Sequence, residues 1–306
     1  MNNTQKEKIL ITGGTGLVGK KITEILTAEG YQVAFLSRQK RAIPHVEVFL
    51  WDTNNNYIDP EAFQNCTAII HLAGENVAEK AWTASRKKAI LESRTQSTAL
   101  LYNAIKANQP ETLKTFISAS AIGIYGLDTG ENWLQENSPA ANDFLANVVV
   151  EWEKEVDTLS TLNLRTAKLR IGVVLSDEGG ALEKIAQPIR YGAGAALGTG
   201  KQYLSWIHIQ DLANMFIFAL KNETIQGTYN AVAPEPATNQ QFTKAVAKIL
   251  KKPLILPNVP AFALKLGLGE MANIVLGGNR VSSQKIQEAG FHFQYPQLEN
   301  SLRSLL

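Results

Sequence analysis

The sequence predicts an α/β fold in which helices cover both faces of a doubly wound, mostly parallel sheet, with a smaller region following at the C-terminal end. Three observations predict this class. Short apolar segments alternate with longer segments of helical spacing, a glycine-rich turn follows the first apolar segment, and a loop-rich texture begins after about residue 175. Short buried strands separated by helices are typical of right-handed βαβ units.

The expected strands all lie in the first 175 residues. We expect them at residues 8–12, 31–36, 46–50, 68–72, 115–118 and 165–175. A first helix is indicated by Val18, Ile22 and Leu26, which are spaced for one helical face, and a long second helix is expected at 83–107. Residues 1–175, joined by parts of 200–235, should form the sheet domain, and 176–306 the smaller substrate or cap region.

Composition excludes several classes of protein. The 306 residues include 30 Lys plus Arg and 28 Asp plus Glu, a balance that argues against a nucleic-acid or polybasic membrane surface. One cysteine, Cys66, allows no internal disulfide and is expected to fill a small buried space, and the four histidines have no zinc-ligand spacing. Without an apolar leader at its start or a membrane-length apolar run, the chain is expected to be cytoplasmic and free of metal.

The glycine-rich turn predicts a dinucleotide site. The segment Gly13-Gly14-Thr15-Gly16-Leu17-Val18-Gly19 stands between an expected strand and an expected helix. In a Rossmann-type fold the first glycine permits the tight turn, the second lets the backbone approach a pyrophosphate, and the third lets helix and strand pack closely. We therefore expect Gly13, Thr15, Gly16, Leu17, Val18 and Gly19 to bind a dinucleotide, helped by the positive end of the helix.

The end of the second strand indicates which dinucleotide is bound. NAD-binding proteins usually carry an acid there, about 20 residues on, for the ribose 2′-hydroxyl. This chain has Ser37 and Arg38, followed by Lys40 and Arg41, and no acid. An Arg guanidinium pairs with a 2′-phosphate, so the segment favours NADP(H); a solvated basic turn is the alternative.

Further cofactor contacts follow from topology, since ligands bind at the carboxyl ends of parallel strands. Asp52 after the third strand is expected to meet the adenine amino group. Leu72, Ala73 and Gly74 end the fourth strand with small residues that leave room for the cofactor. His71 within that strand is expected to be a core residue.

These segments resemble the extended short-chain dehydrogenase/reductases. The GGTGLVG loop, the HLAG strand end, SASAIGIYG and WIHIQD follow that pattern in order. The resemblance narrows to the YfcH-like epimerase family proteins, which have a C-terminal domain of unknown function. It rests on the tracts AGENVAEKAWTASRKKAILESR, LRIGVVLSDEGGAL, GTGKQYLSWIHIQDLA, NAVAPEPATNQQF and GFHFQYPQLENSL.

The resemblance also implies a Tyr-xxx-Lys pair for proton transfer, and this chain lacks it. Phe144 or Leu145 stands where the Tyr is expected, and Val148 or Val149 where the Lys is expected. Neither Phe, Leu nor Val can move a proton. The Ser that holds the substrate oxygen corresponds best to Ser120.

Other groups could take over the missing chemistry. Tyr125 is the nearest phenol in sequence, or else a packing aromatic; Arg94 stands where related enzymes carry an Asn near the nicotinamide, or else forms an exposed ion pair. Glu75 directly after the fourth strand is a candidate acid or substrate ligand. Three more candidate substrate residues lie in segments that border the cleft in related reductases, namely Trp82, Lys201 and Trp206. His208 is expected to be structural.

Together these residues predict an NADP(H)-dependent oxidoreductase or epimerase-like enzyme acting on a small carbonyl or hydroxyl substrate with a non-standard proton donor. Ser120 would position the oxygen, and Tyr125 or a water would supply the proton. The alternative is a protein that senses NADPH without catalysis, which the absent Tyr and Lys suggest.

Overall fold

A computed structural model describes residues 7–306. Its centre is an eight-stranded sheet within that range, in the order β12-β8-β6-β5-β1-β2-β3-β4. Every pair in the sheet is parallel except the edge pair β3–β4. The sheet strands have these bounds: β1 Lys8–Thr12, β2 Gln32–Ser37, β3 Val46–Asp52, β4 Tyr57–Ile58, β5 Cys66–His71, β6 Thr115–Ala121, β8 Arg165–Ile171 and β12 Gly227–Ala231.

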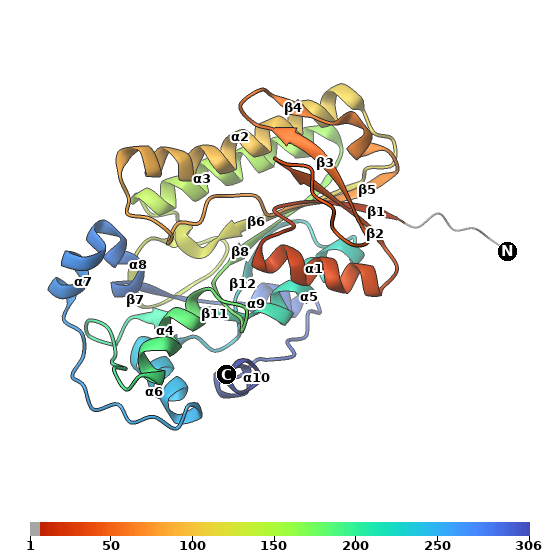
Figure 1. Ribbon diagram of the computed structural model, residues 1–306. Coiled ribbons are helices and arrows are strands. Elements are labelled where there is room, and N and C mark those ends of the chain that lie inside the picture. Colours follow the sequence, from red (N-terminus) through yellow and green to blue (C-terminus); the bar gives the residue numbers. More distant parts are fainter. Residues whose placement is uncertain (1–6) are drawn as a thin grey trace.

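Helices cover both faces of this sheet, which confirms the predicted fold class (Figure 1). On one face α2 (Ala84–Asn108) runs beside α3 (Phe144–Thr158), and on the other α1 (Leu17–Ala28) packs against α5 (Ile209–Lys221). The strands are almost continuously apolar because both faces are covered; Ile9, Leu10 and Ile11 of β1 are fully buried.

One predicted strand is in fact two. The apolar run at 165–175 is interrupted at Gly172, so β8 ends at Ile171 and β9 (Val173–Leu175) leaves the sheet to pair with β11 (Trp206–His208). The prediction of one continuous strand was therefore wrong. Apolar composition does not reveal the point at which a strand changes partners.

The later part of the chain completes the central sheet and also forms a second hydrophobic cluster beside it. Helix α5 and strand β12 return to the central sheet. A second hydrophobic cluster, centred on Leu182, Trp206, Phe242 and Leu302, lies among the later helices. The remaining elements are β7 Asp128–Leu134, α4 Ala181–Arg190, β10 Tyr203–Leu204, β13 Ala237–Thr238, α6 Asn239–Ile249, α7 Ala261–Leu268, α8 Ala272–Leu276, β14 Gly278–Val281, α9 Gln284–Glu288 and α10 Leu298–Leu305.

Four short 3₁₀ turns in the described residues connect these elements: η1 Pro60–Phe63, η2 Ile122–Tyr125, η3 Leu159–Leu162 and η4 Gly269–Met271. Of these, η2 matters for the site because it follows β6 directly at the carboxyl edge of the sheet.

Candidate cofactor and active site

The glycine loop between β1 and α1 is shaped to admit a diphosphate. Gly13 has a left-handed φ of +69°, and a Cβ there would lie 3.0 Å from the backbone of Leu72. Gly16 donates its N–H to the Gly13 carbonyl at 3.0 Å and caps α1 without a side chain. The exposed backbone at this helix start leaves the first N–H groups of α1 available to an anion.

Gly19 has a packing role in the same loop. A Cβ on Gly19 would lie 2.5 Å from the Gly13 carbonyl oxygen, so only glycine lets α1 approach the turn this closely. This is the role that the motif predicts for its third glycine.

A cleft of about 600 Å³ runs from this loop across the carboxyl ends of β1, β2 and β5. At one end it is lined by Ser37, Arg38 and Arg41 after β2; at the other by Gly74 and Glu75 after β5. Arg38 and Arg41 are both exposed at the cleft mouth. Two guanidinium groups stand at the end of β2, and the one acid among the described lining residues, Glu75, follows β5 and is paired with Arg86. This arrangement fits a 2′-phosphate rather than a free 2′-hydroxyl.

A buried polar network holds the strand end Leu72–Ala73 in place. The Thr12 Oγ1 accepts the backbone N–H groups of Leu72 and Ala73, both at 3.1 Å, and donates to Nδ1 of His71 at 2.7 Å. Nε2 of His71 lies 3.3 Å from the Ser97 hydroxyl. Burial lowers the pKa of His71 to about 3, so the imidazole is neutral and acts as a core residue, as predicted.

Glu75 at the inner end of the cleft is held by two arginines, Arg86 and Arg94, neither of which lines the cleft of the described chain itself. Arg86 pairs with the Glu75 carboxylate at 2.8 Å, and Arg94 donates to the Glu75 backbone carbonyl at 3.1 Å. The hydrogen bond from Arg86 lowers the pKa of Glu75, and burial lowers the pKa of Arg94 to about 10. Glu75 is therefore an anion and Arg94 a cation near neutral pH. Arg94 also lies over the ring of Trp152, which differs from the exposed ion pair considered above.

Ser120 and Tyr125 lie in a second buried network under the sheet edge. The Ser120 hydroxyl donates to Glu153 at 2.6 Å, and Glu153 is held by Arg170 through two hydrogen bonds of 2.8 and 2.9 Å. Arg170 also donates to the Tyr125 hydroxyl at 3.0 Å, which in turn donates to Asn230 at 2.7 Å. Each hydroxyl already has its partners inside the protein.

The surroundings of Glu153 and Tyr125 in this network determine their protonation states. Although burial works against the carboxylate, the hydrogen bonds and charge of Arg170 lower the pKa of Glu153 overall. Burial raises the pKa of Tyr125, so its phenol stays protonated across the neutral range. Neither Ser120 nor Tyr125 lines the dinucleotide cleft formed within residues 7–306.

The positions of α3 where the related enzymes carry Tyr and Lys are occupied by apolar residues in this chain. A Cβ at Gly123 of η2 would be 3.6 Å from Cβ of Leu145 and 4.0 Å from Cγ2 of Val149. The side chains of α3 that face the carboxyl edge of β6 thus offer neither a hydroxyl nor an ammonium group at these positions.

Asp52, predicted to meet the adenine amino group, is not part of the cleft in the described chain. Asp52 is held by Asn54 and Asn55 in its own turn and does not line the cleft of the described chain, which Trp51 and Thr53 line instead. Hydrogen bonding from Asn55 lowers the pKa of Asp52. The expected contact of Asp52 with adenine therefore has no support in this arrangement.

The two tryptophans have different roles. Trp82 is half-buried, donates to the Val77 carbonyl at 2.8 Å and packs edge-on against Phe144 at 5.0 Å. Trp206 is completely buried in the second cluster and bonds the Glu235 carbonyl, so its expected place on the cleft wall was wrong. The alternating pattern of its strand could not show which face is inside.

His208 and Cys66 are structural, as predicted. His208 accepts the Gln210 N–H at the start of α5 and stacks on Tyr295 at 3.9 Å, and burial lowers its pKa to about 4. Cys66 is fully buried, and burial raises the pKa of its thiol to about 12.

Several cleft residues were missed by sequence reasoning. The most informative are Ser93 and Ser97, which stand four apart on α2, directly beside Arg94. That spacing places them on one helix face and could have revealed them. Gly14 lies within the glycine-rich turn, although no contact was predicted for it. The others have no distinctive signal in one sequence: Phe35, Leu36, Gln39, Trp51 and Thr53.

Residues 7–306 contain no group of three or more His, Cys, Asp or Glu side chains arranged to hold a metal ion. Among the helices in this range, none combines the length and the apolar character required to span a bilayer.

Comparison with known proteins identifies the family. Residues 9–231 match the NAD dependent epimerase/dehydratase family. The chain belongs to this family. Residues 259–305 match a domain of unknown function, DUF1731, so the epimerase family resemblance predicted from the sequence is confirmed in both its parts.

Relatives of this family match along nearly the whole chain. The epimerase family protein YfhF of Bacillus subtilis is 36% identical over 299 residues, which cover 97% of each chain. The chloroplastic SDR39U1 homolog of Arabidopsis thaliana is 34% identical over 313 residues, covering 99% of this chain and 89% of the relative. The crystal structure of human SDR39U1 (isoform 2) with NADPH superimposes with a TM-score of 0.84 at 29% identity, covering 97% and 98% of the two chains.

Proposed function

We propose that this family member binds NADP(H) in the cleft along β1, β2 and β5 and exchanges a hydride between the nicotinamide and a small carbonyl or hydroxyl substrate. The observation that carries the cofactor assignment is the pair Arg38 and Arg41 at the β2 end of a cleft whose floor is the glycine loop. The NADPH in the related human structure supports the same assignment.

The residues present fit such a cofactor. When bound, the nicotinamide supplies or accepts the hydride. The chain's own part is to hold the pyrophosphate on the N–H groups at the start of α1 and the 2′-phosphate on Arg38 and Arg41. Gly14 makes room for the ring of Phe35, which a Cβ on Gly14 would overlap, and Gly13 lets the loop pass close to the backbone of Leu72.

We assign Ser120 and Tyr125 to positioning rather than proton transfer. Both hydroxyls are engaged by Glu153, Arg170 and Asn230, and the pKa of Tyr125 is raised by burial. At the inner end of the cleft Glu75 is the charged lining residue among those described, and Arg86 and Arg94 lie behind it, bonded to its carboxylate and to its backbone carbonyl. Cations there favour a negative charge developing on a substrate oxygen, and water then supplies the proton.

The apolar residues Leu145 and Val149, which stand where the related enzymes carry Tyr and Lys, favour a second candidate function, NADPH sensing without turnover. One experiment separates the two. NADPH affinity is measured by fluorescence titration, and the loss of reduced-nicotinamide absorbance is then followed against a panel of aldehydes, ketones and quinones.

Turnover of a panel compound supports hydride transfer, and Arg94→Lys should then lower kcat more than it weakens NADPH binding. Saturable NADPH binding with no turnover of any compound supports the sensor. Absence of saturable binding rejects both. Tyr125→Phe serves as the matched control because it removes one hydroxyl without touching the cleft; a large selective loss of kcat in this variant would overturn its positioning role.

A further inference from the structure

The inner end of the dinucleotide cleft carries a negative charge. Among the described lining residues three are charged: Arg38 and Arg41 stand at the β2 end, and Glu75 stands at the inner end, after β5. The Glu75 side chain is 33% exposed. Its carboxylate is ionised at neutral pH, because the hydrogen bond from Arg86 lowers its pKa. A bound group at this end of the cleft therefore meets an anion.

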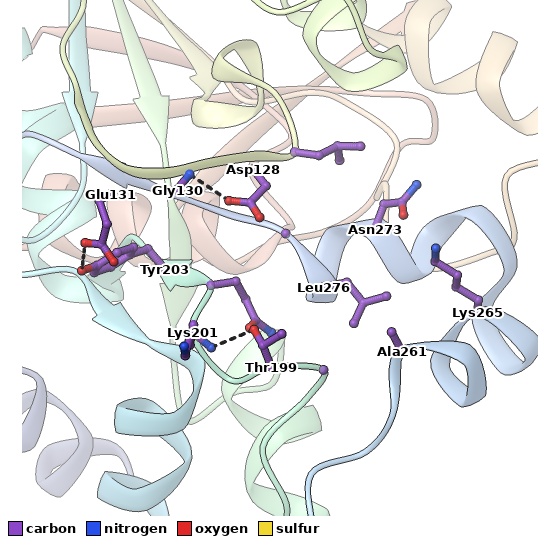
Figure 2. Close-up of a pocket in the computed structure, with 14 residues that line it drawn as sticks. Asp128, Gly130, Glu131, Thr199, Lys201, Tyr203, Ala261, Lys265, Asn273 and Leu276 are labelled. Atoms are coloured by element: carbon purple, nitrogen blue, oxygen red, sulfur yellow. Dashed lines mark hydrogen bonds between the residues drawn. The ribbon is translucent and has the colours of Figure 1, made fainter.

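A second cavity, of about 430 Å³, differs in this respect. It lies between β7, the loop before β10, α7 and α8 (Figure 2). Its described lining has two carboxylates, of Asp128 and Glu131, and two ammonium groups, of Lys201 and Lys265. These charges balance, so the cavity does not select a ligand by net charge. Within residues 7–306 it shares no lining residue with the dinucleotide cleft, so Lys201 lies away from the proposed cofactor.

Hydrogen bonds with side chains of α2 hold Glu75 in place. Its backbone N–H donates to the Ser93 hydroxyl at 3.0 Å, and its carbonyl accepts Nη2 of Arg94 at 3.1 Å. Nη1 of Arg86 donates to Oε2 at 2.8 Å, and Nη2 of the same guanidinium donates to the Asn76 carbonyl at 2.6 Å. Of the residues that the structure describes, none donates to Oε1. The carboxylate is therefore fixed in position and keeps one oxygen without a protein partner.

The direction of the dinucleotide in the cleft follows from the cofactor assignment proposed above. Arg38 and Arg41 receive the 2′-phosphate of the adenosine half, and the start of α1 receives the pyrophosphate. The nicotinamide half then extends from the glycine loop toward the opposite end of the cleft, at Gly74 and Glu75.

The charge of the nicotinamide ring depends on its oxidation state. The ring is neutral in NADPH and positive in NADP⁺, so a carboxylate at this end of the cleft attracts the oxidised form more strongly. Arg86 and Arg94 oppose this attraction, but both lie behind Glu75, and neither lines the cleft of the described chain. Arg86 is also shared with Glu79, at 3.6 Å. Because Coulomb attraction weakens with distance, the lining carboxylate has the larger effect.

On the basis of this cofactor site, we propose that Glu75 stabilises NADP⁺ relative to NADPH and so favours the reduction of a carbonyl substrate. A protein that binds the oxidised cofactor more tightly makes the bound reduced cofactor a stronger hydride donor. In this direction the carbonyl carbon gains a hydride, the carbonyl oxygen gains a proton from water, and NADPH is converted to NADP⁺. The substrate class is therefore a carbonyl compound, and the product is an alcohol.

The test compares the affinities of the full chain for NADPH and NADP⁺. NADPH binding is measured by fluorescence titration, and NADP⁺ binding by its displacement of NADPH. Glu75→Gln keeps an acceptor for Arg86 and removes the charge. It should weaken NADP⁺ binding about three- to tenfold and change NADPH binding by less than about twofold. Equal changes in the two affinities, or a larger loss for NADPH, overturn the proposal.

Three further variants separate the charge of Glu75 from its support of the loop. Glu75→Asp keeps the charge and should keep the ratio of the two affinities within about twofold of wild type, even where both affinities change. Glu79→Gln is the matched control, because it removes a carboxylate that bonds the same guanidinium but is 54% exposed and lies outside the described cleft lining. Arg86→Gln removes the cation behind Glu75 and should shift the ratio toward NADP⁺. A shift toward NADPH in this variant overturns the proposal even if Glu75→Gln does not fold.

Failure of the cofactor site has a different signature. If neither nucleotide binds the wild type, the cofactor site is wrong, and the role of Glu75 is rejected with it. If both nucleotides bind and their ratio does not depend on Glu75, the cofactor site stands and only the role of Glu75 is rejected.

Discussion

Arg38 is the single side chain on which cofactor choice depends most. It stands at the end of β2 and lines the cleft, so removing its guanidinium should leave the 2′-phosphate with less compensation. We expect Arg38→Ala to weaken NADPH binding by about 1.5–3 kcal/mol, the contribution of a hydrogen bond to a charged group, with little effect on NADH. Fluorescence titration with both nucleotides measures this.

Lys40→Ala is the control for that variant, because Lys40 is an exposed cation on the same loop that does not line the cleft of the described chain. It should change neither affinity beyond the general effect of a surface charge. Equal losses of NADPH and NADH binding in Arg38→Ala would show that this residue supports the loop and does not recognise the phosphate.

His71 should make the stability of the protein depend on pH. Its pKa is about 3 in the folded protein and near 6.5 when exposed. As the pH falls below 6.5, His71 is protonated in the unfolded state but stays neutral in the folded state. The free energy of unfolding therefore decreases with acidification until about pH 3. Between about pH 7.5 and 5.5 the free energy of unfolding should fall by about 1.4 kcal/mol from this residue.

Urea unfolding of wild type and His71→Asn at those two pH values isolates this contribution. The variant should be less stable at the higher pH, because its network with Thr12 and Ser97 is altered, yet lose less stability on acidification. His45→Asn is the comparison, because His45 is an exposed turn residue whose side chain forms no hydrogen bond with the described part of the chain. A pH dependence identical in wild type and His71→Asn would contradict the burial of a neutral imidazole.

For single residues, the sequence predicted roles that depend on position along a strand. It did not predict roles that depend on the direction in which a side chain points. Arg38 and Gly74 follow from the rule that strand ends meet at one edge of the sheet. Ser120 and Tyr125 also lie near that edge, but their hydroxyls turn toward Glu153 and Arg170. Adjacent strand residues point to opposite faces, so register and the position of α3 determine this, and neither can be read from one sequence.

Among the elements, the break at Gly172 shows how one residue redirects a strand. A Cβ there would overlap the Ser205 carbonyl and lie 2.7 Å from Val232, because β9 passes close to the next segment as it leaves the sheet. Gly172→Ala should therefore reduce the free energy of unfolding by about 1–3 kcal/mol, the usual cost of overpacking. Chemical denaturation followed by circular dichroism measures the loss.

Gly267→Ala provides the matched control. Gly267 lies in α7 with no atom of the described chain within 4 Å of an added Cβ, so alanine should leave stability unchanged or raise it by about 0.5–1 kcal/mol through helix propensity. Should Gly172→Ala be as stable as this control, β9 would have to diverge without the close approach described above.

For the whole molecule, the sequence predicted the order and class of the main layers but not the pairings that complete them. The short pairs β10–β13 and β14–β7 join segments far apart in the chain. Three of these strands, β10, β13 and β14, have only two to four residues, too few for a recognisable periodicity, and the partners of all four are chosen by tertiary packing. The second cavity, which lies among these pairs, could not have been predicted for the same reason.

The C-terminal helix α10 should contribute to the free energy of unfolding of the whole molecule. Leu302 is fully buried in the second cluster with Trp206, and Asp211 of α5 accepts the N–H groups of Gln294 and Tyr295. Leu302→Ala should therefore reduce stability by about 2–5 kcal/mol. Leu266→Ala, in α7, removes a side chain that is 88% exposed and should change stability by no more than about 0.5 kcal/mol.

Cofactor binding offers a test of whether this loss is global. A ligand that binds only the folded state adds about 2.7 kcal/mol at a hundred times its Kd. If α10 and the dinucleotide cleft unfold together, NADPH should raise the free energy of unfolding of Leu302→Ala and of wild type by the same amount, and urea unfolding measures both. Trp206 lies in the cluster that Leu302 completes and is one of five tryptophans that contribute to the fluorescence signal, so a transition confined to this region would change only part of that signal. A separate, NADPH-independent transition in Leu302→Ala would instead show that the second cluster unfolds on its own while the sheet stays intact.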